Sequence, residues 1–363
     1  MLRTVPGLEQ RGWRFVFWAS RPSALYDELS ARDLDVHGLP RQLAYSLQGL
    51  RHPPGPASRL ASVPSYLRGL RATIRRASPA IVHANSLYTL AEAAVARAAG
   101  RPTVLHVHEM LPAGRKGWMA RRLAHAVSDE LIAVSRASAA ALALPGSEPR
   151  IVYEGAPLPA EPRSRDGGSE RMIVGTVGVI SSRKGSDLFV EAARLVGART
   201  DQIEFRMIGA PTDVLEQDWA QDVLEHAQQV GIVHRLRADV VAELRRWDAF
   251  VLPSRRDPFP ISLLEAMGTG LPVIGTAVDG IREQITPETG ILVDPESPQG
   301  LANAILELQR SPDSRRRMGL AARRRMSDHF TVERQTEGIH DAYLAALRAR
   351  GRYHLTLPTT RRP

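Results

Sequence analysis

Residues 250–283 read FVLPSRRDPFPISLLEAMGTGLPVIGTAVDGIRE, and the order of apolar runs and breakers in them predicts how this chain folds. The run Phe250 to Leu252 predicts a strand that stops at Pro253, because proline lacks the N–H that a central strand must donate. Behind Pro260, apolar residues recur at helical spacing, which is typical of a helix that begins at a proline. A second apolar run, Leu271 to Ile274, predicts the next strand. Strand, loop, helix and strand in this order indicate parallel βαβ units.

Two carboxylates of this segment lie 265 − 257 = 8 residues apart, Asp257 on the loop and Glu265 in the helix that follows it. A carboxylate accepts hydrogen bonds from neighbouring sugar hydroxyls, and the amides at a helix start and around Gly280 can donate to a phosphate. The pattern therefore favours a nucleotide-sugar site. The alternative is that both acids only cap and solvate a helix.

The segment resembles the donor site of retaining family 4 glycosyltransferases, which have the GT-B architecture. Their usual pattern is Glu, any residue, Phe, Gly, and a second Glu eight residues after the first. Asp257 stands at the first Glu and Pro260 at the Gly, so the sugar contact of the shorter Asp257 side chain is expected to be weaker than that of Glu265. The resemblance implies an α/β fold of two Rossmann-like domains that face each other.

The resemblance also implies which residues bind the donor, all of them in the second domain. They are Gly178, Arg183, Lys184, Asp257, Phe259, Pro260, Ile261, Glu265, Asp279, Gly280 and Ile281. Arg183 and Lys184 match the family's diphosphate-binding pair. Independently, two cations at a helix start oppose the helix dipole unless an anion binds there. Together with Asp257 and Glu265 they are expected to be catalytic, and no metal or cofactor is expected.

Histidines mark the expected acceptor side in the first domain. His83 and His108 are predicted at the carboxyl ends of parallel strands, where sites form. The segments around them resemble two acceptor-domain signatures, which implies that His83 and Glu109 contact substrate and that the catalytic His108 lies near the transferred sugar. His106 points to the other face and is expected to be structural. A metal held by His106 and His108 is a rival hypothesis, disfavoured because the sequence offers few further ligands nearby.

Composition narrows the class of protein. The chain has 363 residues, 43% of them hydrophobic, and it lacks any run of 18 apolar residues, so we expect a soluble protein with room for two cores. It contains no cysteine, which excludes disulfides and thiolate metal sites and fits a reducing cytoplasm. The full dinucleotide fingerprint is absent around Gly175 and Gly178, which argues against a nicotinamide enzyme.

The net charge of +9 is concentrated in the first half of the chain. Residues 1–150 contain 20 Arg and Lys against 10 Asp and Glu, which gives +10, and the remainder contains 48 − 20 = 28 against 39 − 10 = 29, which gives −1. We find no nucleic-acid recognition motif, so an anionic membrane surface or an anionic lipid-linked acceptor is the expected partner. The segments Tyr66–Arg76 and Pro112–His125 combine basic and apolar residues and are candidates for contact with the inner face of the plasma membrane. Alternatively, the first is a solvated surface helix packed on the sheet, and Trp118 of the second only contributes to packing.

We expect four parts along the chain. They are an acceptor domain at 1–155, a nucleotide-sugar domain at 156–330, a helix at 331–350 that returns to the first domain, and a disordered tail at 351–363. Family members begin with a strand and a Gly-rich loop, whereas here a helix at Leu2–Gly12 leads straight into a predicted strand at Trp13. We therefore expect that a central strand and about 20–30 residues are missing, the length of one β-loop-α unit.

The predicted function is transfer of a sugar from a nucleoside-diphosphate sugar to a glycan, lipid-linked or other acceptor, with retention of configuration. A role in cell-surface polysaccharide or glycolipid synthesis is expected. Arg183 and Lys184 would stabilise the charge of the leaving diphosphate without a metal. Two alternatives stay open: a nucleotide-sugar epimerase of the same architecture, which would turn over without an acceptor, and a non-catalytic nucleotide-sugar-binding protein.

Overall fold

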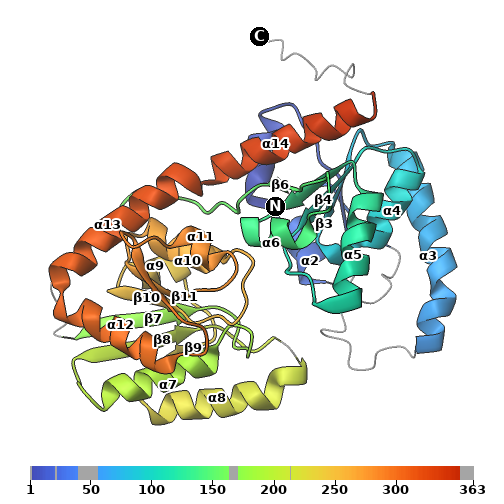
Figure 1. Ribbon diagram of the computed structural model, residues 1–363. Helices are drawn as coiled ribbons and strands as arrows, with labels where there is room; N and C mark the ends of the chain where they lie inside the picture. The colour runs from blue at the N-terminus through green and yellow to red at the C-terminus, as the bar shows by residue number, and fades with distance from the viewer. Residues whose placement is uncertain (1, 21–22, 40–55, 163–170, 213, 352–363) are drawn as a thin grey trace. The chain divides into compact units, whose positions relative to one another are not determined.

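The computed structural model describes residues 2–20, 23–39, 56–162, 171–212 and 214–351. The chain forms two compact units (Figure 1). The first unit comprises Met1–Val134, Ala139–Val152 and Thr336–Pro363, and the second comprises Ser135–Ser138 and Tyr153–Gln335. Among the helices of the described ranges, none is both long and apolar enough to cross a bilayer.

The second unit is built on a six-stranded parallel sheet. Its strands are β7 (Met172–Val177), β8 (Ile203–Ile208), β9 (Val233–Arg235), β10 (Ala249–Leu252), β11 (Val273–Thr276) and β12 (Gly290–Val293). The order across the sheet is β12-β11-β10-β7-β8-β9, so the chain winds outward from β7 in one direction and from β10 in the other. Ligands of such sheets bind beyond the carboxyl ends of the two strands where the direction reverses, here β7 and β10.

Helices cover both faces of this sheet. One layer consists of α7 (Ser186–Gly197), α8 (Gln217–Gln229) and α12 (Pro298–Arg310), and it packs on Val174, Phe205 and Val251 in the main core of the unit. The other layer consists of α9 (Val240–Leu244), α10 (Ile261–Gly268), α11 (Ile281–Gln284) and α13 (Pro312–His329). The short helix η3 (Val214–Glu216) lies beside α8 of the first layer. The central strands β7, β10 and β11 are buried on both faces, which explains why they read as continuous apolar runs.

The contact between β7 and Trp247, two residues before β10, is unusually close. Trp247 is fully buried, and its ring lies against Gly175, where a Cβ atom would be 2.4 Å from the ring. Gly175 pairs with Phe250 across the sheet, and the rings of Trp247 and Phe250 stack 6.4 Å apart. Glycine is therefore required at position 175 to seat the indole.

The first unit contains two parallel sheets. One has the order β3 (Val82–Asn85), β4 (Thr103–Val107), β5 (Glu130–Ala133) and β6 (Arg150–Ile151), and the other pairs β1 (Phe17–Ser20) with β2 (Val36–Leu39). Within the described ranges, β1 pairs only with β2, and β3 pairs only with β4. The expectation of a missing central strand stays a prediction.

Helices again pack on both faces. The helices of this unit are η1 (Leu2–Thr4), α1 (Val5–Glu9), α2 (Ala24–Ala31), α3 (Pro56–Ala77), η2 (Leu87–Thr89), α4 (Leu90–Ala98) and α5 (Gly114–Val127), together with α6 (Arg136–Leu142) from Ala139 onward and α14 (Val332–Ala349) from Thr336 onward. Leu105 and Leu131 pack with α4, α5 and α6, whereas Val104 and Ile132 pack with Leu8 of α1 and with α14. Alternate residues of each strand thus point to opposite faces of the sheet and pack against different helices.

Two strand boundaries predicted from the sequence are wrong. The strand expected at Trp13 begins only at Phe17, because Trp13 packs on α14 and donates its Nε1 hydrogen to His340 Nδ1 at 2.9 Å. The strand that contains His83 runs on to Asn85, because its pairing with β4 continues to that residue. His83 is therefore inside a strand and not at its carboxyl end. The predicted tail beyond Gly351 lies outside the described residues.

The expectation that His106 faces away from His108 is wrong, because residues two apart on a strand share a face and the two rings lie 4.2 Å apart. The structural role of His106 stays a prediction. His106 is fully buried in β4, and within the described ranges neither of its ring nitrogens has a hydrogen-bond partner. Burial lowers the pKa of His106 well below its usual value, and the neighbouring His108 and His83 lower it further. The imidazole is therefore neutral in the folded protein.

This burial makes folding stability depend on pH. The unfolded chain takes up a proton at position 106 below about pH 6.5 and the folded chain does not, so stability should fall as the pH drops, by at most about 1.4 kcal/mol per pH unit. Urea titrations between pH 7 and 5 measure how the free energy of unfolding depends on pH. In His106→Leu, the part of this pH dependence that comes from His106 should be lost. His226→Gln, at an exposed position on α8, is the control and should keep the slope. An identical slope in His106→Leu and the parent would contradict the assignment.

Gly175→Ala should destabilise the second unit. The new methyl group meets the Trp247 ring, and overpacking of this kind typically costs about 1–3 kcal/mol. Chemical denaturation measures the change. Gly197→Ala is the matched control, because a Cβ at that helical glycine of α7 meets nothing within 4 Å. The control should be neutral or slightly stabilising, and equal losses in both variants would reject the explanation.

Candidate functional site

Two loops meet where the winding of the second sheet reverses. The first, residues 178–185, follows β7, and the second, residues 253–260, follows β10. Arg255 N donates to Arg183 O at 2.9 Å, and Arg183 Nη1 donates to Arg256 O at 3.1 Å. Gly185 has a positive φ of 67°, and a Cβ there would lie 2.0 Å from Pro253 O. Only glycine allows this approach, so the sequence itself holds the two loops in contact.

A buried ion pair joins the same loops. Lys184 Nζ lies 2.6 Å from Asp257 Oδ2, and Ser254 Oγ donates to the same oxygen at 3.3 Å. Asp257 is only 4% exposed, and the Lys184 side chain is 16% exposed. The Asp257 carboxylate is thus occupied by Lys184, and this pairing was not part of the role expected from the sequence.

Arg183 is the more accessible of the two predicted phosphate-binding cations. Its side chain is 52% exposed, and its Nη1 lies 4.0 Å from Asp257 Oδ2. The hydrogen bond to Arg256 O holds the guanidinium beside Lys184. The structure thus places two cations beside each other at the strand ends, where an anionic ligand could reach them.

Arg255 forms a clamp that the sequence did not reveal. Its guanidinium makes two hydrogen bonds to Asp187, both at 2.8 Å, two to Glu296 at 2.6 and 3.0 Å, and one to Ser182 O at 2.7 Å. These carboxylates raise the pKa of Arg255 above its usual value. Five hydrogen bonds use the full donor capacity of an arginine, so Arg255 fixes the loop and is not available to a ligand.

A second contact fixes the loop after β7 from its other end. The Glu216 carboxylate at the end of η3 accepts hydrogen bonds from Ser182 N at 3.1 Å and from Ser182 Oγ. Ser182 directly precedes Arg183 and Lys184. Its N–H donates to Glu216 and its carbonyl accepts from Arg255, so the backbone that carries both cations is fixed. An acid within a short helix is the only sequence signal for this contact, and it does not identify the partner.

The remaining predicted donor residues are mostly packing residues. Phe259 is buried, stacks on Tyr153 at 5.0 Å and meets Phe330 edge-on at 5.4 Å. Ile281 is fully buried, and Pro260 is the N-cap of α10 with its carbonyl bonded by Gln284. Side chains so enclosed can contribute only their backbone groups to a ligand. Ile261 and Glu265 on α10 are half-buried and keep part of their surface exposed.

Asp279 and Gly280 support the loop after β10. Asp279 Oδ2 accepts from Asp257 N at 2.9 Å, and Gly280 N donates to Asp257 O at 3.1 Å. A Cβ at Gly280 would lie 1.9 Å from Pro258 O, so this glycine allows a close crossing of two backbones. Gly178 lies beside the Lys184 side chain, whose Cε would be 3.8 Å from a Cβ at that position.

In the first unit, His108 directly follows β4. Its Nε2 lies 2.9 Å from Asn85 Oδ1, and its ring is 4.2 Å from that of His106. The Glu109 carboxylate accepts from Ser86 Oγ, and from Leu87 N and His108 N at 3.1 Å each. Glu109 therefore holds the turn behind β3 together.

The predicted contact residue His83 lies in β3, and its ring bonds the Tyr343 hydroxyl at 2.9 Å. Tyr343 is a core residue of α14, and burial raises the pKa of its phenol. The rings of His83 and His106 are 5.5 Å apart. His83, His106 and His108 therefore form a row of imidazoles that leads from the interior of β3 to the carboxyl end of β4.

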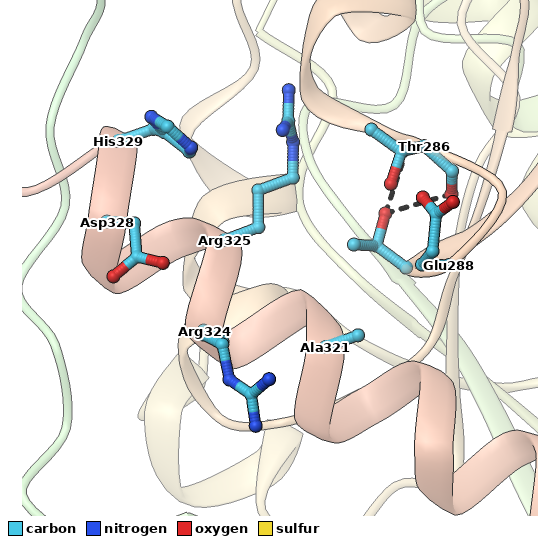
Figure 2. A pocket seen from close by; sticks show the side chains of 8 residues that line it. Thr286, Glu288, Ala321, Arg324, Arg325, Asp328 and His329 are labelled. Atoms are coloured by element: carbon cyan, nitrogen blue, oxygen red, sulfur yellow. Dashed lines mark hydrogen bonds between the residues drawn. The ribbon is translucent and has the colours of Figure 1, made fainter.

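A separate shallow pocket lies between α13 and the loop before β12 (Figure 2). Its lining residues are Thr286, Glu288, Thr289, Ala321, Arg324, Arg325, Asp328 and His329. Arg325 donates to Gln284 O at 2.8 Å and to Glu283 O at 2.7 Å, so it stabilises the loop. The lining carries both signs of charge and includes none of the predicted site residues, and we assign it no role.

Comparison with known proteins identifies both halves of the chain. Residues 1–158 match the model of Glycosyltransferase Family 4, and residues 161–325 match that of Glycosyl transferases group 1. A glycogen synthase of Mycobacterium tuberculosis is 29% identical over 313 residues, which cover 79% of this chain and 73% of the relative. A D-inositol 3-phosphate glycosyltransferase of Geodermatophilus obscurus is 33% identical over 183 residues, 47% of this chain and 39% of the relative.

Solved structures agree on the fold. Anabaena Alr3699/HepE in complex with UDP-glucose has a TM-score of 0.78 and 20% identity, with 94% of this chain and 93% of that chain covered. A sucrose-phosphate synthase from Thermosynechococcus elongatus has a TM-score of 0.76 and 19% identity, with 96% and 92% covered. With two family models that together span most of the sequence, the chain belongs to the GT-B glycosyltransferases of family 4 type and is an enzyme of that class.

Proposed function

We propose that this glycosyltransferase moves a sugar from a nucleoside-diphosphate sugar to a glycan, lipid-linked or other acceptor, with retention of configuration. The observation that supports it most is the position of Arg183 and Lys184, adjacent cations at the strand ends where the sheet winding reverses, beside the buried Asp257. Parallel sheets of this type bind phosphate-containing ligands at this place. The family is consistent with a role in cell-surface polysaccharide or glycolipid synthesis.

On the donor side, Arg183 and Lys184 are proposed to bind the diphosphate. A lysine ammonium has three donors, and Asp257 uses one of them, so Lys184 can bind a phosphate oxygen without leaving its partner. Glu265, half-buried on α10, is proposed to accept hydrogen bonds from ribose or sugar hydroxyls. Backbone groups at Gly178, Phe259, Pro260, Ile261 and Asp279–Ile281 complete the proposed site. The complexes of HepE contain UDP and UDP-glucose, so uridine nucleotides are the first donors to test.

The proposed chemistry needs little beyond electrostatics. When the bond between sugar and diphosphate breaks, negative charge develops on the leaving oxygen, and Arg183 and Lys184 would stabilise it. Their loop is already fixed by Arg255 and Glu216, so little reorganisation would be needed during the reaction. A donor phosphate oxygen is proposed to help remove the acceptor proton on the same face, which gives retention without a metal.

On the acceptor side, His108 is proposed to position the transferred sugar, with His83 and Glu109 supporting it. Glu109 fixes the backbone of His108 through the hydrogen bond from His108 N. The positive excess of residues 1–150 suits an anionic acceptor at the inner face of the plasma membrane.

Lys184→Met should lower the affinity for a nucleoside diphosphate about ten- to a hundred-fold, because a charge-assisted hydrogen bond to phosphate is lost. The affinity for the matching nucleoside, which carries no phosphate, should not change. Isothermal titration of uridine and UDP measures both. Addition of EDTA should alter neither affinity nor transfer.

The double variant Lys184→Met/Asp257→Asn separates binding from stability. Lys184→Met alone leaves Asp257 buried without its cation and should lower the melting temperature, whereas the double variant should recover part of that loss but none of the UDP affinity. Equal losses for uridine and UDP in Lys184→Met would show that the fold, and not the diphosphate contact, was damaged. Unchanged UDP affinity would reject the donor site.

Arg255→Lys should reduce UDP affinity or turnover about ten-fold, although the charge is kept. A lysine cannot pair with Asp187 and Glu296 in the two-pronged manner of a guanidinium, so the cation loop loses its clamp. Asp187→Asn should give a similar loss, and combining the two should add little, as expected for residues of one network.

The matched control for this clamp is Glu191→Gln on the same helix. Glu191 pairs with Arg194 on the surface, at 2.7 Å, and its loss should change neither UDP affinity nor turnover. If Glu191→Gln and Arg255→Lys behave alike, the clamp has no special part in positioning Arg183 and Lys184.

A further inference from the structure

The structure separates the two basic segments that the sequence offered for membrane contact. In α3 the apolar residues Tyr66, Leu70 and Ile74 are buried at 3%, 3% and 2% exposure and pack in a core with Leu39 and Ala96. The apolar face of α3 is therefore used inside the protein. Its arginines at 68, 71, 75 and 76 remain at the surface and present charge alone.

The helix α5 presents a different surface. Its inner side, with Gly117, Ala124 and Val127, is buried, whereas Trp118, Met119 and Leu123 are 55%, 54% and 47% exposed. Met119 and Leu123 are four residues apart and are therefore neighbours on the helix surface. At about 100° per residue, Trp118 lies about 100° around the helix from Met119, still on the exposed side. Large apolar side chains exposed together on one side of a helix mark an interaction surface.

Basic residues accompany these apolar residues within α5, and the helix itself contains no acidic residue. Between Leu111 and Ser128 the chain contains Arg115, Lys116, Arg121 and Arg122 and no Asp or Glu. Arg115, Lys116 and Arg122 are exposed, and the Arg122 guanidinium lies 5.1 Å from the centre of the Trp118 ring. A cation above an indole keeps the ring at the surface in a fixed orientation.

We propose that α5 is the element by which this enzyme binds an anionic lipid surface, with Trp118, Met119 and Leu123 inserted among the headgroups. The apolar residues alone would suit a protein partner, but a rim of cations with an indole and flexible aliphatic side chains is the composition of helices that lie in a bilayer interface. The inference deepens the proposed function, because it names the surface on which a lipid-linked acceptor is met.

The helix is also well anchored for such a role. His125 in its last turn bonds Leu142 O at 2.8 Å and Ser147 Oγ at 3.1 Å, and Gly117 lies so close to Pro112 O that a Cβ would be 1.9 Å away. The inner face therefore stays in place while the outer face is free to contact lipid.

The test is sedimentation with vesicles of phosphatidylglycerol or of phosphatidylcholine, at low and high salt. The parent protein should bind the anionic vesicles, less so at high salt, and stay in the supernatant with the neutral ones. Trp118→Ala/Leu123→Ala should lower the partition coefficient at least about ten-fold through lost apolar burial. Parent tryptophan fluorescence should shift to the blue on binding, and this shift should disappear in the variant.

A pair of charge variants distinguishes insertion from long-range attraction. Arg115→Gln/Lys116→Gln on α5 and Arg75→Gln/Arg76→Gln on α3 remove the same charge. The α5 variant should lose about 25-fold in partitioning, about five-fold per cation at the surface, and the α3 variant far less. Equal losses, or no fluorescence shift, would overturn the proposal. Binding to polyglutamate but not to vesicles would assign the face to an acidic protein and overturn it as well.

This outcome is independent of the donor site. Uridine diphosphate affinity, measured without lipid, should be the same in the α5 variants and the parent, and Lys184→Met should bind vesicles normally. Failure of vesicle binding with intact UDP affinity therefore rejects the α5 proposal alone, and the reverse result rejects the donor site alone.

Discussion

The ion pair between Lys184 and Asp257 is the interaction on which the arrangement of the donor loops depends. A carboxylate that is 4% exposed is stable as a charge only if a cation and further hydrogen bonds replace the water it has lost. Lys184 supplies the cation, and Ser254 supplies a further hydrogen bond. Because the two charges come from loops behind neighbouring strands, the pair also fixes the ends of β7 and β10 relative to each other.

The basic residues around this ion pair differ in how many of their hydrogen-bond donors are already engaged. Arg255 is fully used by Asp187, Glu296 and Ser182 O, and so has a structural role although it lies two residues from Asp257. Arg183 keeps half of its side chain exposed, and Lys184 keeps two of its three donors. Nearness in sequence to the site thus does not decide which basic residue can meet a phosphate. The number of donors already engaged decides it.

The sequence was sufficient for the fold class and for the two loops that form the proposed donor site, because apolar strands, glycine breaks and helical spacing are local signals. It could not reveal the Arg255 clamp, since Asp187 and Glu296 lie 68 and 41 residues away and their pairing depends on how the sheet closes. It placed His83 at a strand end, because the pairing that extends β3 to Asn85 is tertiary. It also could not distinguish α3 from α5, because both helices combine basic and apolar residues. The apolar side chains Tyr66, Leu70 and Ile74 of α3 are buried, whereas Trp118, Met119 and Leu123 of α5 are exposed.

In evolutionary terms, the buried pair limits the routes by which such an enzyme can change its donor. A single substitution that removes the charge at 184 or at 257 leaves its partner as an uncompensated buried charge, at a cost of about 3–5 kcal/mol. That is a large part of the net stability of about 5–15 kcal/mol that a typical protein has. In the proposed donor site, the half-exposed Ile261 and Glu265 are therefore freer to change than positions 184 and 257, which are under pressure to change together.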